Sequence, residues 1–161
     1  MILNYNQAIN ANFKIQIPGE HELEFYAVST NIPTVSLSPI EVPWQDSRLK
    51  VPDNKYIWDD LTIQFILDED LYSYELLRDW LIKVRSEDLW QKGLKDINII
   101  PLDSNKNVEY SFVAQGAWPN MIGGWQYTSA SNISEYITFD VTFSYQHLDI
   151  KRTKPLGFSI I

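Results

Sequence analysis

The stretch from Tyr136 to Gln146, YITFDVTFSYQ, shows the clearest alternation in the chain. Its apolar residues occupy every second position and its polar residues the positions between them: Ile137, Phe139, Val141, Phe143 and Tyr145 against Thr138, Asp140, Thr142, Ser144 and Gln146. Neighbouring side chains of a strand point to opposite faces of its sheet. The pattern therefore predicts a strand with one face in a core and the other in water.

Other segments carry the same signal. Phe13 to Ile17 alternates and stops at Pro18-Gly19, and Leu23 to Val28 resumes after that turn, which predicts a hairpin over 13–28. Leu61 to Leu67 is a further alternating strand. Short strands are also predicted from Ile97 to Ile100, ended by Pro101, and from Val108 to Gln115, ended by Gly116. Turns are predicted at Trp118-Pro119-Asn120 and at Gly123-Gly124.

One segment changes to the helical period. Leu77, Trp80, Leu81 and Val84 are spaced i, i+3, i+4 and i+7, which predicts an amphipathic helix over about residues 70–85. The preceding run Asp68-Glu69-Asp70 offers N-caps for it. Together these segments predict a mainly β fold with one α-helix, an antiparallel β-barrel or sandwich flanked by that helix, in a single domain over residues 1–161.

Residues 40–58, together with the preceding Pro39, contain both prolines and many apolar residues. Pro39, Pro43 and Pro52 argue against a central strand, because proline cannot donate to a ladder. Ile40, Val42, Trp44, Leu49 and Val51 nevertheless keep the segment apolar. We expect a protruding hairpin or loop that needs a partner surface, and the alternative is a segment that folds back over its own core.

Composition limits the function. The net charge of −8 makes the chain a poor candidate for binding nucleic-acid phosphates, although acidity also serves solubility alone. The absence of cysteine excludes disulfides and thiolate metal sites. The first residues have no basic region followed by an apolar one, so we expect no secretory signal, and no apolar run suggests membrane insertion.

No catalytic constellation is found, so we expect neither catalytic residues nor a cofactor or metal. His21 and His147 each lack a second ligand nearby in sequence, and the Asp68-Glu69-Asp70 carboxylates are explained by capping more simply than by a hard cation. No phosphate-binding glycine motif occurs. A carbohydrate-binding β module is the alternative from another class, because Trp44, Trp90 and Trp125 could stack on sugars.

The order of segments resembles the tail tube proteins of T4-like contractile-tailed bacteriophages, which share the tail tube or Hcp-like fold. The resemblance runs from about residue 13 to residue 148. Its first stretch is Phe13 to Ile17 with Leu23 to Pro33. The second contains Arg48-Leu49-Lys50-Val51, Trp58-Asp59-Asp60-Leu61-Thr62-Ile63, Asp68-Glu69 and Arg78-Asp79-Trp80. The third contains Gly116-Ala117-Trp118-Pro119-Asn120, Gly124 and Ile137 to Tyr145.

The resemblance implies a structural virion protein. Six copies would close into a ring, and rings would stack by self-assembly into the inner tube of a contractile tail, the conduit for DNA ejection. The implied partners are other copies of the chain, the tail sheath protein, and the baseplate tube-initiator and tail terminator proteins. Double-stranded DNA would pass through the lumen without specific binding. The resemblance also implies that the protein assembles in the host cytoplasm and is part of the virion tail. A baseplate tube-initiator or tube-cap ring of the same fold is the alternative.

The resemblance also assigns surfaces. Residues 40–58 map to the family's inter-ring hairpin, with Trp44, Arg48, Lys50, Tyr56 and Trp58 expected at the ring-stacking interface. The polar face of the closing strand would line the lumen through Thr138, Asp140, Thr142 and Ser144. Residues 150–161 depart from the family as a C-terminal extension, basic and then apolar. Lys151, Arg152 and Lys154 are its cations, available to pair with an acidic neighbouring ring.

Overall fold

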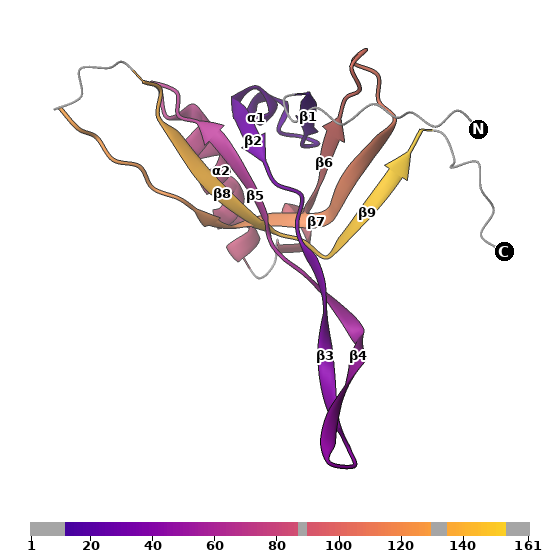
Figure 1. Ribbon diagram of the computed structural model, residues 1–161. Helices are drawn as coiled ribbons and strands as arrows, with labels where there is room; N and C mark the ends of the chain where they lie inside the picture. Colours follow the sequence, from indigo (N-terminus) through magenta and orange to yellow (C-terminus); the bar gives the residue numbers. More distant parts are fainter. Residues whose placement is uncertain (1–11, 87–89, 130–134, 154–161) are drawn as a thin grey trace.

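A computed structural model describes residues 12–86, 90–129 and 135–153 (Figure 1). Its strands form a seven-stranded sheet and a separate two-stranded sheet. Every pairing between named strands is antiparallel. One principal helix accompanies them. The predicted fold class, mainly antiparallel β with one main helix, is confirmed.

The elements follow one another along the chain in this order: β1 (Phe13–Gln16), α1 (His21–Tyr26), β2 (Ala27–Thr30), β3 (Val35–Trp44), β4 (Ser47–Trp58), β5 (Leu61–Ile66), α2 (Tyr72–Arg85), the short 3-10 helix η1 (Trp90–Gly93), β6 (Lys95–Pro101), β7 (Tyr110–Ile122), β8 (Thr138–Ser144) and β9 (His147–Arg152). The large sheet has the order β1-β6-β7-β8-β5-β2, and β9 also pairs with β7. No helix in these described ranges is long and apolar enough to cross a bilayer.

Strand β7 joins the two halves of the large sheet. Its first part pairs with β6 and β9, and its second part pairs with β8. The prediction that Gly116 ends a strand and that Trp118-Pro119-Asn120 is a turn was wrong. Gly116 has φ of 62°, a left-handed conformation that glycine adopts without a Cβ penalty, so the strand continues through it. The register shifts between Pro119 and Met121, an irregularity of the kind that accommodates a proline within a sheet.

The core lies where the sheet halves meet the helices. The alternation predicted for β5 and β8 is confirmed, because Leu61, Ile63 and Phe65 are buried on one strand and Phe139, Val141 and Phe143 on the other. Of the predicted stripe on helix α2, Leu77 and Trp80 are buried, and Leu81 and Val84 are half-buried. The remaining buried members come from the β1–α1 segment and from β6, β7 and β9: Ile15, Ile17, Leu23, Ile97, Ile99, Ala114, Ala117 and Leu148.

The predicted hairpin over 13–28 was wrong, because a helical turn separates its two strands. β1 pairs with β6 and β2 with β5, with α1 between them. A strand would have placed Leu23 and Phe25 on one face, whereas two residues of helix rotate them about 200° apart. Leu23 is fully buried and Phe25 is 86% exposed, as the helix requires. Glu24 also accepts a hydrogen bond from the Ile17 N–H at 3.1 Å, which supports the turn.

Helix α2 begins at Tyr72 and is capped by Asp68. The Asp68 carboxylate accepts hydrogen bonds from the backbone N–H groups of Tyr72 and Ser73, both at 3.0 Å, and from the Ser73 hydroxyl. Burial alone would raise the pKa of Asp68, but these hydrogen bonds outweigh it and hold the pKa below its ordinary value. Asp68 therefore caps the helix, as predicted, although Leu71 occupies the N-cap position itself.

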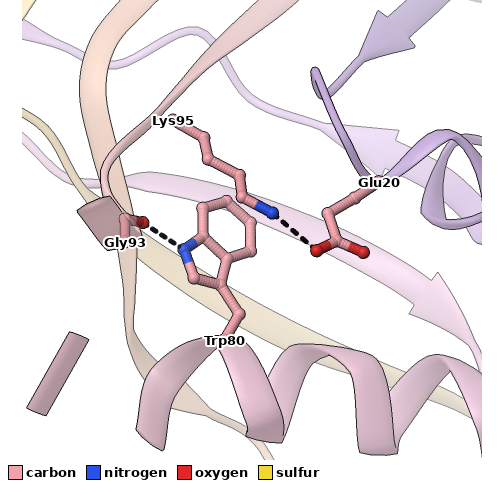
Figure 2. A network of polar contacts seen from close by, with 4 residues as sticks. All are labelled: Glu20, Trp80, Gly93 and Lys95. Atoms are coloured by element: carbon pink, nitrogen blue, oxygen red, sulfur yellow. Dashed lines mark hydrogen bonds and ion pairs between the residues drawn. The ribbon is translucent and has the colours of Figure 1, made fainter. Parts of the chain in front are cut away.

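A polar network fastens α2 to the segments on either side of it (Figure 2). The buried Trp80 indole donates to the Gly93 carbonyl at 2.5 Å. Lys95 places its ammonium 4.9 Å from the centre of the Trp80 ring and 2.5 Å from a carboxylate oxygen of Glu20. Residues far apart in the sequence are thus joined by side-chain contacts, and the buried tryptophan N–H has its hydrogen-bond acceptor.

The last described strand takes up the start of the expected C-terminal extension. Ile150, Lys151 and Arg152 pair with Phe112, Ser111 and Tyr110 in the register of β9 with β7. The Arg152 guanidinium lies 5.8 Å from the centre of the Tyr110 ring. These residues therefore belong to the sheet, and residues 154–161, with Lys154, lie outside the described part of the chain.

Candidate functional site

The hairpin of β3 and β4 stands apart from the rest of the described molecule. Its two strands pair only with each other, and they extend away from the large sheet (Figure 1). Every residue of β3 is exposed. The hairpin begins at Val35, earlier than the expected start at residue 40, and ends at Trp58.

The register divides the outer half of this hairpin into two different faces. Directly opposed residues of an antiparallel pair lie on the same face. Val42 faces Leu49, Ile40 faces Val51 and Trp44 faces Ser47, so one side is apolar. Glu41 faces Lys50 and Pro43 faces Arg48, so the other side is charged. We call Ile40, Val42, Trp44, Leu49 and Val51 the apolar hairpin face.

The five residues predicted for ring stacking do not form one patch. Trp44 lies at the tip on the apolar hairpin face and is 60% exposed. Arg48 and Lys50 lie on the opposite side, and Arg48 pairs with Glu41 at 3.0 Å. Tyr56 and Trp58 lie near the body, with ring centres 5.7 Å apart. Trp58 is half-buried against the core, so it anchors the hairpin and is not a free contact residue.

Prolines limit how the hairpin can bind. Pro39 faces Pro52 across the two strands, and Pro43 faces Arg48. A proline has no N–H with which to join another strand, so these positions resist edge-to-edge addition. At these positions, contact through the side chains of the two hairpin faces is favoured over the addition of another strand.

The predicted lumen residues lie on the outward face of the β5–β8 pair. Thr142 faces Thr62, Asp140 faces Gln64 and Thr138 faces Ile66. Ser29 of β2 extends this face and donates to Gln64 at 3.3 Å. Asp140 is the one charged residue in this row, which otherwise consists of hydroxyl, amide and one aliphatic side chain. The fourth predicted residue, Ser144, differs, because its hydroxyl is bound to Asp60 and Asn120.

The ionisable side chains of the described residues do not gather into a metal site. No group of three or more His, Cys, Asp or Glu side chains in the described ranges is arranged to hold a metal ion. His21 and His147 are both exposed, one on α1 and the other at the start of β9.

Burial, with the nearby Asp60 and Asp59 carboxylates, raises the pKa of the Tyr145 phenol, whose hydroxyl donates to the Asp59 carbonyl at 2.7 Å.

Of the tryptophans considered for sugar stacking, Trp44 and Trp125 lie in different parts of the molecule, and the side chain of Trp90 lies outside the described part of the structure. Trp44 is at the hairpin tip, whereas Trp125 packs against Tyr74 and Phe139 with ring centres 5.1 and 5.9 Å away. The Trp125 ring therefore belongs to the edge of the core. Because these two rings serve different parts of the molecule, they do not build a common platform for a sugar.

Two phage proteins are similar in sequence to this chain. The tail tube protein of Serratia phage KSP90 is 28% identical over 125 residues, 74% of this chain and 70% of that protein. The tail tube terminator protein of Enterobacteria phage T4 is 23% identical over 162 residues, 92% of this chain and 91% of that protein. No family model matches the chain.

Solved structures decide the fold. The tube-terminating cap of the anti-feeding prophage matches with a TM-score of 0.72 at 15% identity, covering 95% of this chain and 96% of that one. The chain has the tail-tube fold. A chain of the sheath/tube terminator of the PVC extracellular contractile injection system also matches, with a TM-score of 0.70 at 14% identity, over 93% of this chain and 99% of that one. The resemblance noted in the sequence is confirmed, since the tail-tube fold covers nearly the whole chain.

The sequence pointed to some of these surfaces and missed others. The alternation of Ile40, Val42 and Trp44 signals the apolar hairpin face, although only Trp44 among them was predicted as a contact. Thr62 and Gln64 alternate with buried residues in β5, a signal sufficient to add them to the polar row. No local signal identifies the Asp60–Asn120–Ser144 contacts, because the three residues come from distant parts of the chain.

Proposed function

We propose that this chain is the ring-forming structural subunit of the tube in a contractile phage tail. The observation that carries the proposal is the exposed apolar hairpin face on a chain with the tail-tube fold. Isolated proteins rarely expose a contiguous apolar surface without a partner for it. A second copy in the next ring supplies that partner.

Rings are proposed to form through the edges of the large sheet. β1 and β2 lie at the two ends of the strand order, and each is only four residues long. An edge strand presents unpaired N–H and C=O groups, and closed symmetry removes such edges by pairing them between copies. A closed ring of six copies satisfies this requirement.

Stacking is proposed to use the two hairpin faces differently. The apolar hairpin face packs on the neighbouring ring, with Trp44 as the principal anchor, because buried aromatic residues dominate interface energies. Arg48 and Lys50, on the other side, make charged contacts that fix the register between rings. Tyr56 and Trp58 support the base of the hairpin.

The channel wall is proposed to be the polar row that includes Thr138, Asp140 and Thr142, extended by Thr62 and Gln64. Such a wall presents no cation to DNA phosphates, so it offers no contacts that release counterions and hold the duplex. Double-stranded DNA then passes without specific binding. The tail sheath surrounds the tube, and initiator and terminator rings close its ends. The assembled protein belongs to the virion tail after assembly in the host cytoplasm.

A terminator or cap ring is the second candidate. It is supported by the T4 relative, which is a tube terminator and aligns with nearly the whole chain, and by the anti-feeding prophage cap. A tube subunit must accept its own hairpin on the opposite face of the ring, so its rings stack without limit. A terminator, or an initiator, needs only one such face.

Electron microscopy of the purified chain at rising concentration tests the proposal, with mass photometry of the same samples. Six-fold rings that stack into long hollow tubes are expected for a tube subunit. Single or paired rings that never elongate would indicate a terminator or initiator. A protein that stays monomeric and binds glycans would contradict the structural role altogether.

A further inference from the structure

The base of the hairpin is a change of sheet within a continuous chain. β4 ends at Trp58, β5 begins at Leu61, and only Asp59 and Asp60 lie between them. The other strand enters at Thr34, whose carbonyl accepts a hydrogen bond from the Asp59 N–H at 3.0 Å. The direction of the whole hairpin therefore depends on how these few residues are held against the body.

Beside the Tyr145 hydroxyl, which donates to the Asp59 carbonyl at 2.7 Å, three polar side chains meet at this point. The Asn120 amide donates to Asp60 at 3.2 Å and to the Ser144 hydroxyl at 2.5 Å. The Ser144 hydroxyl in turn donates to the other carboxylate oxygen of Asp60 at 3.1 Å. Both amide hydrogens and the hydroxyl hydrogen are thus used within one closed cycle. The three residues come from the β4–β5 link, β7 and β8, so the cycle ties the hairpin base to two neighbouring strands of the large sheet.

The length of the hairpin amplifies any motion at its base. At about 3.3 Å per residue, strands of ten and twelve residues reach roughly 35 Å. A rotation of about 10° at Asp60 would therefore move the tip by roughly 6 Å. A displacement of that size exceeds what a packed side-chain contact tolerates, so an interface at Trp44 needs a fixed base.

We propose that Asp60, Asn120 and Ser144 are positioning residues that set the direction of the β3–β4 hairpin and thereby the stacking geometry of successive rings. This inference rests on the proposed function for its second part only. The cycle does not contribute to the core, because Asp60 and Asn120 are exposed and Ser144 is half-buried. Its removal should change the orientation of the hairpin much more than the stability of the body.

The chain contains no cysteine, so two labels can be introduced selectively. Asp46→Cys at the hairpin tip and Asp79→Cys on α2 are both exposed sites for spin labels. Pulsed electron–electron distance measurements on the monomer are expected to give one narrow distribution for the otherwise unchanged chain. Adding Asn120→Ala should make it at least about twice as wide, through the same lever length.

Matched variants separate positioning from a general structural effect. Asn107→Ala removes a surface amide that donates to Asp103 in a distant turn, so it should leave the distribution narrow. Ser144→Ala should widen the distribution, while Ser144→Thr keeps the hydroxyl and should leave it narrow. Equal widths for Asn120→Ala and Asn107→Ala would overturn the assignment.

Tube assembly tests the second part. If the unchanged chain forms tubes, Asn120→Ala should give short or irregular tubes, and Asn107→Ala should give regular ones. Regular tubes from a variant with a widened distribution would show that the base does not govern stacking. Failure of the unchanged chain to form rings or tubes would count against the proposed function, whereas the distance measurement on monomers would still decide the positioning role.

Discussion

The β3–β4 hairpin and the β5–β8 pair share the same alternating sequence pattern, but only the β5–β8 pair is covered by other elements. Both are antiparallel, and both alternate apolar with polar residues. In β5 and β8 the apolar residues are buried beneath α2 and the rest of the sheet. In β3 the corresponding residues are all exposed, because no described element packs over them.

The comparison shows that the same alternation of apolar residues stabilises the fold in one region and is available for assembly in the other. In the body, burial contributes to folding of the chain itself. On the hairpin the same kind of surface contributes nothing until a second surface covers it, when apolar burial stabilises at about 25 cal/mol per Å². The contrast predicts that substitutions in the two pairs separate stability from assembly.

The largest effect is expected from Phe65→Ala in the body. Phe65 is fully buried and stacks on Phe139 with ring centres 6.0 Å apart. Removing the ring leaves a cavity, and the free energy of unfolding should fall by about 3–5 kcal/mol. Urea denaturation followed by circular dichroism measures it. A loss of under about 1 kcal/mol would mean that the body is packed no more tightly than a surface.

Gly93→Ala should have the next largest effect. A Cβ at Gly93 would lie 2.6 Å from Cγ2 of Val84 and 3.3 Å from its Cα, so α2 and η1 would have to separate. Overpacking of this kind costs about 1–3 kcal/mol. Gly124→Ala is the matched control, because nothing lies within 4 Å of its Cβ position. The same denaturation experiment should find that variant nearly unchanged, and equal losses for both would refute the close approach.

Asp68→Ala should destabilise the folded chain by about 1 kcal/mol at neutral pH through loss of the helix cap. The folded pKa of Asp68 is lowered, so its contribution is complete above the unfolded pKa of about 3.9 and is lost as pH falls through the folded value. The stability difference between the unchanged chain and the variant should therefore shrink below about pH 4. A difference that stayed constant from neutral to acidic pH would exclude the carboxylate as the cap.

The smallest effect on stability is expected on the hairpin. Trp44→Ala should change the unfolding free energy of the monomer by at most about 0.5 kcal/mol, because the ring is mostly exposed. The Trp44→Ala variant should instead need a higher protein concentration to assemble than the unchanged chain, measured by light scattering and electron microscopy. Trp58→Ala is the informative contrast, since Trp58 packs on the core and should lower stability too. Unaltered assembly of Trp44→Ala would remove the apolar hairpin face from the interface.

Much of the body was predictable, because local patterns decide it. The alternation of β5 and β8, the stripe of α2 and the capping role of Asp68 all depend on residues close in sequence. The failures occurred where local signals conflicted with distant contacts. The spacing of Leu23 and Phe25 fits a strand with both side chains on one face. In the structure only Leu23 is buried, which requires a helical turn. Gly116 is a typical residue for a strand end. In the structure β7 continues through it, because the residues before and after it pair with neighbouring strands.

The sequence by itself determined the mainly β fold, the long helix α2 and an apolar segment too rich in proline to be a central strand. Periodicity, capping and turn formation depend on residues close together in the sequence, so the sequence alone predicts them. Only the tertiary structure decided which strands pair, how the hairpin divides into an apolar and a charged face, and how Asp60, Asn120 and Ser144 meet at its base. Those outcomes depend on register and on contacts between distant residues, which local physical chemistry does not specify.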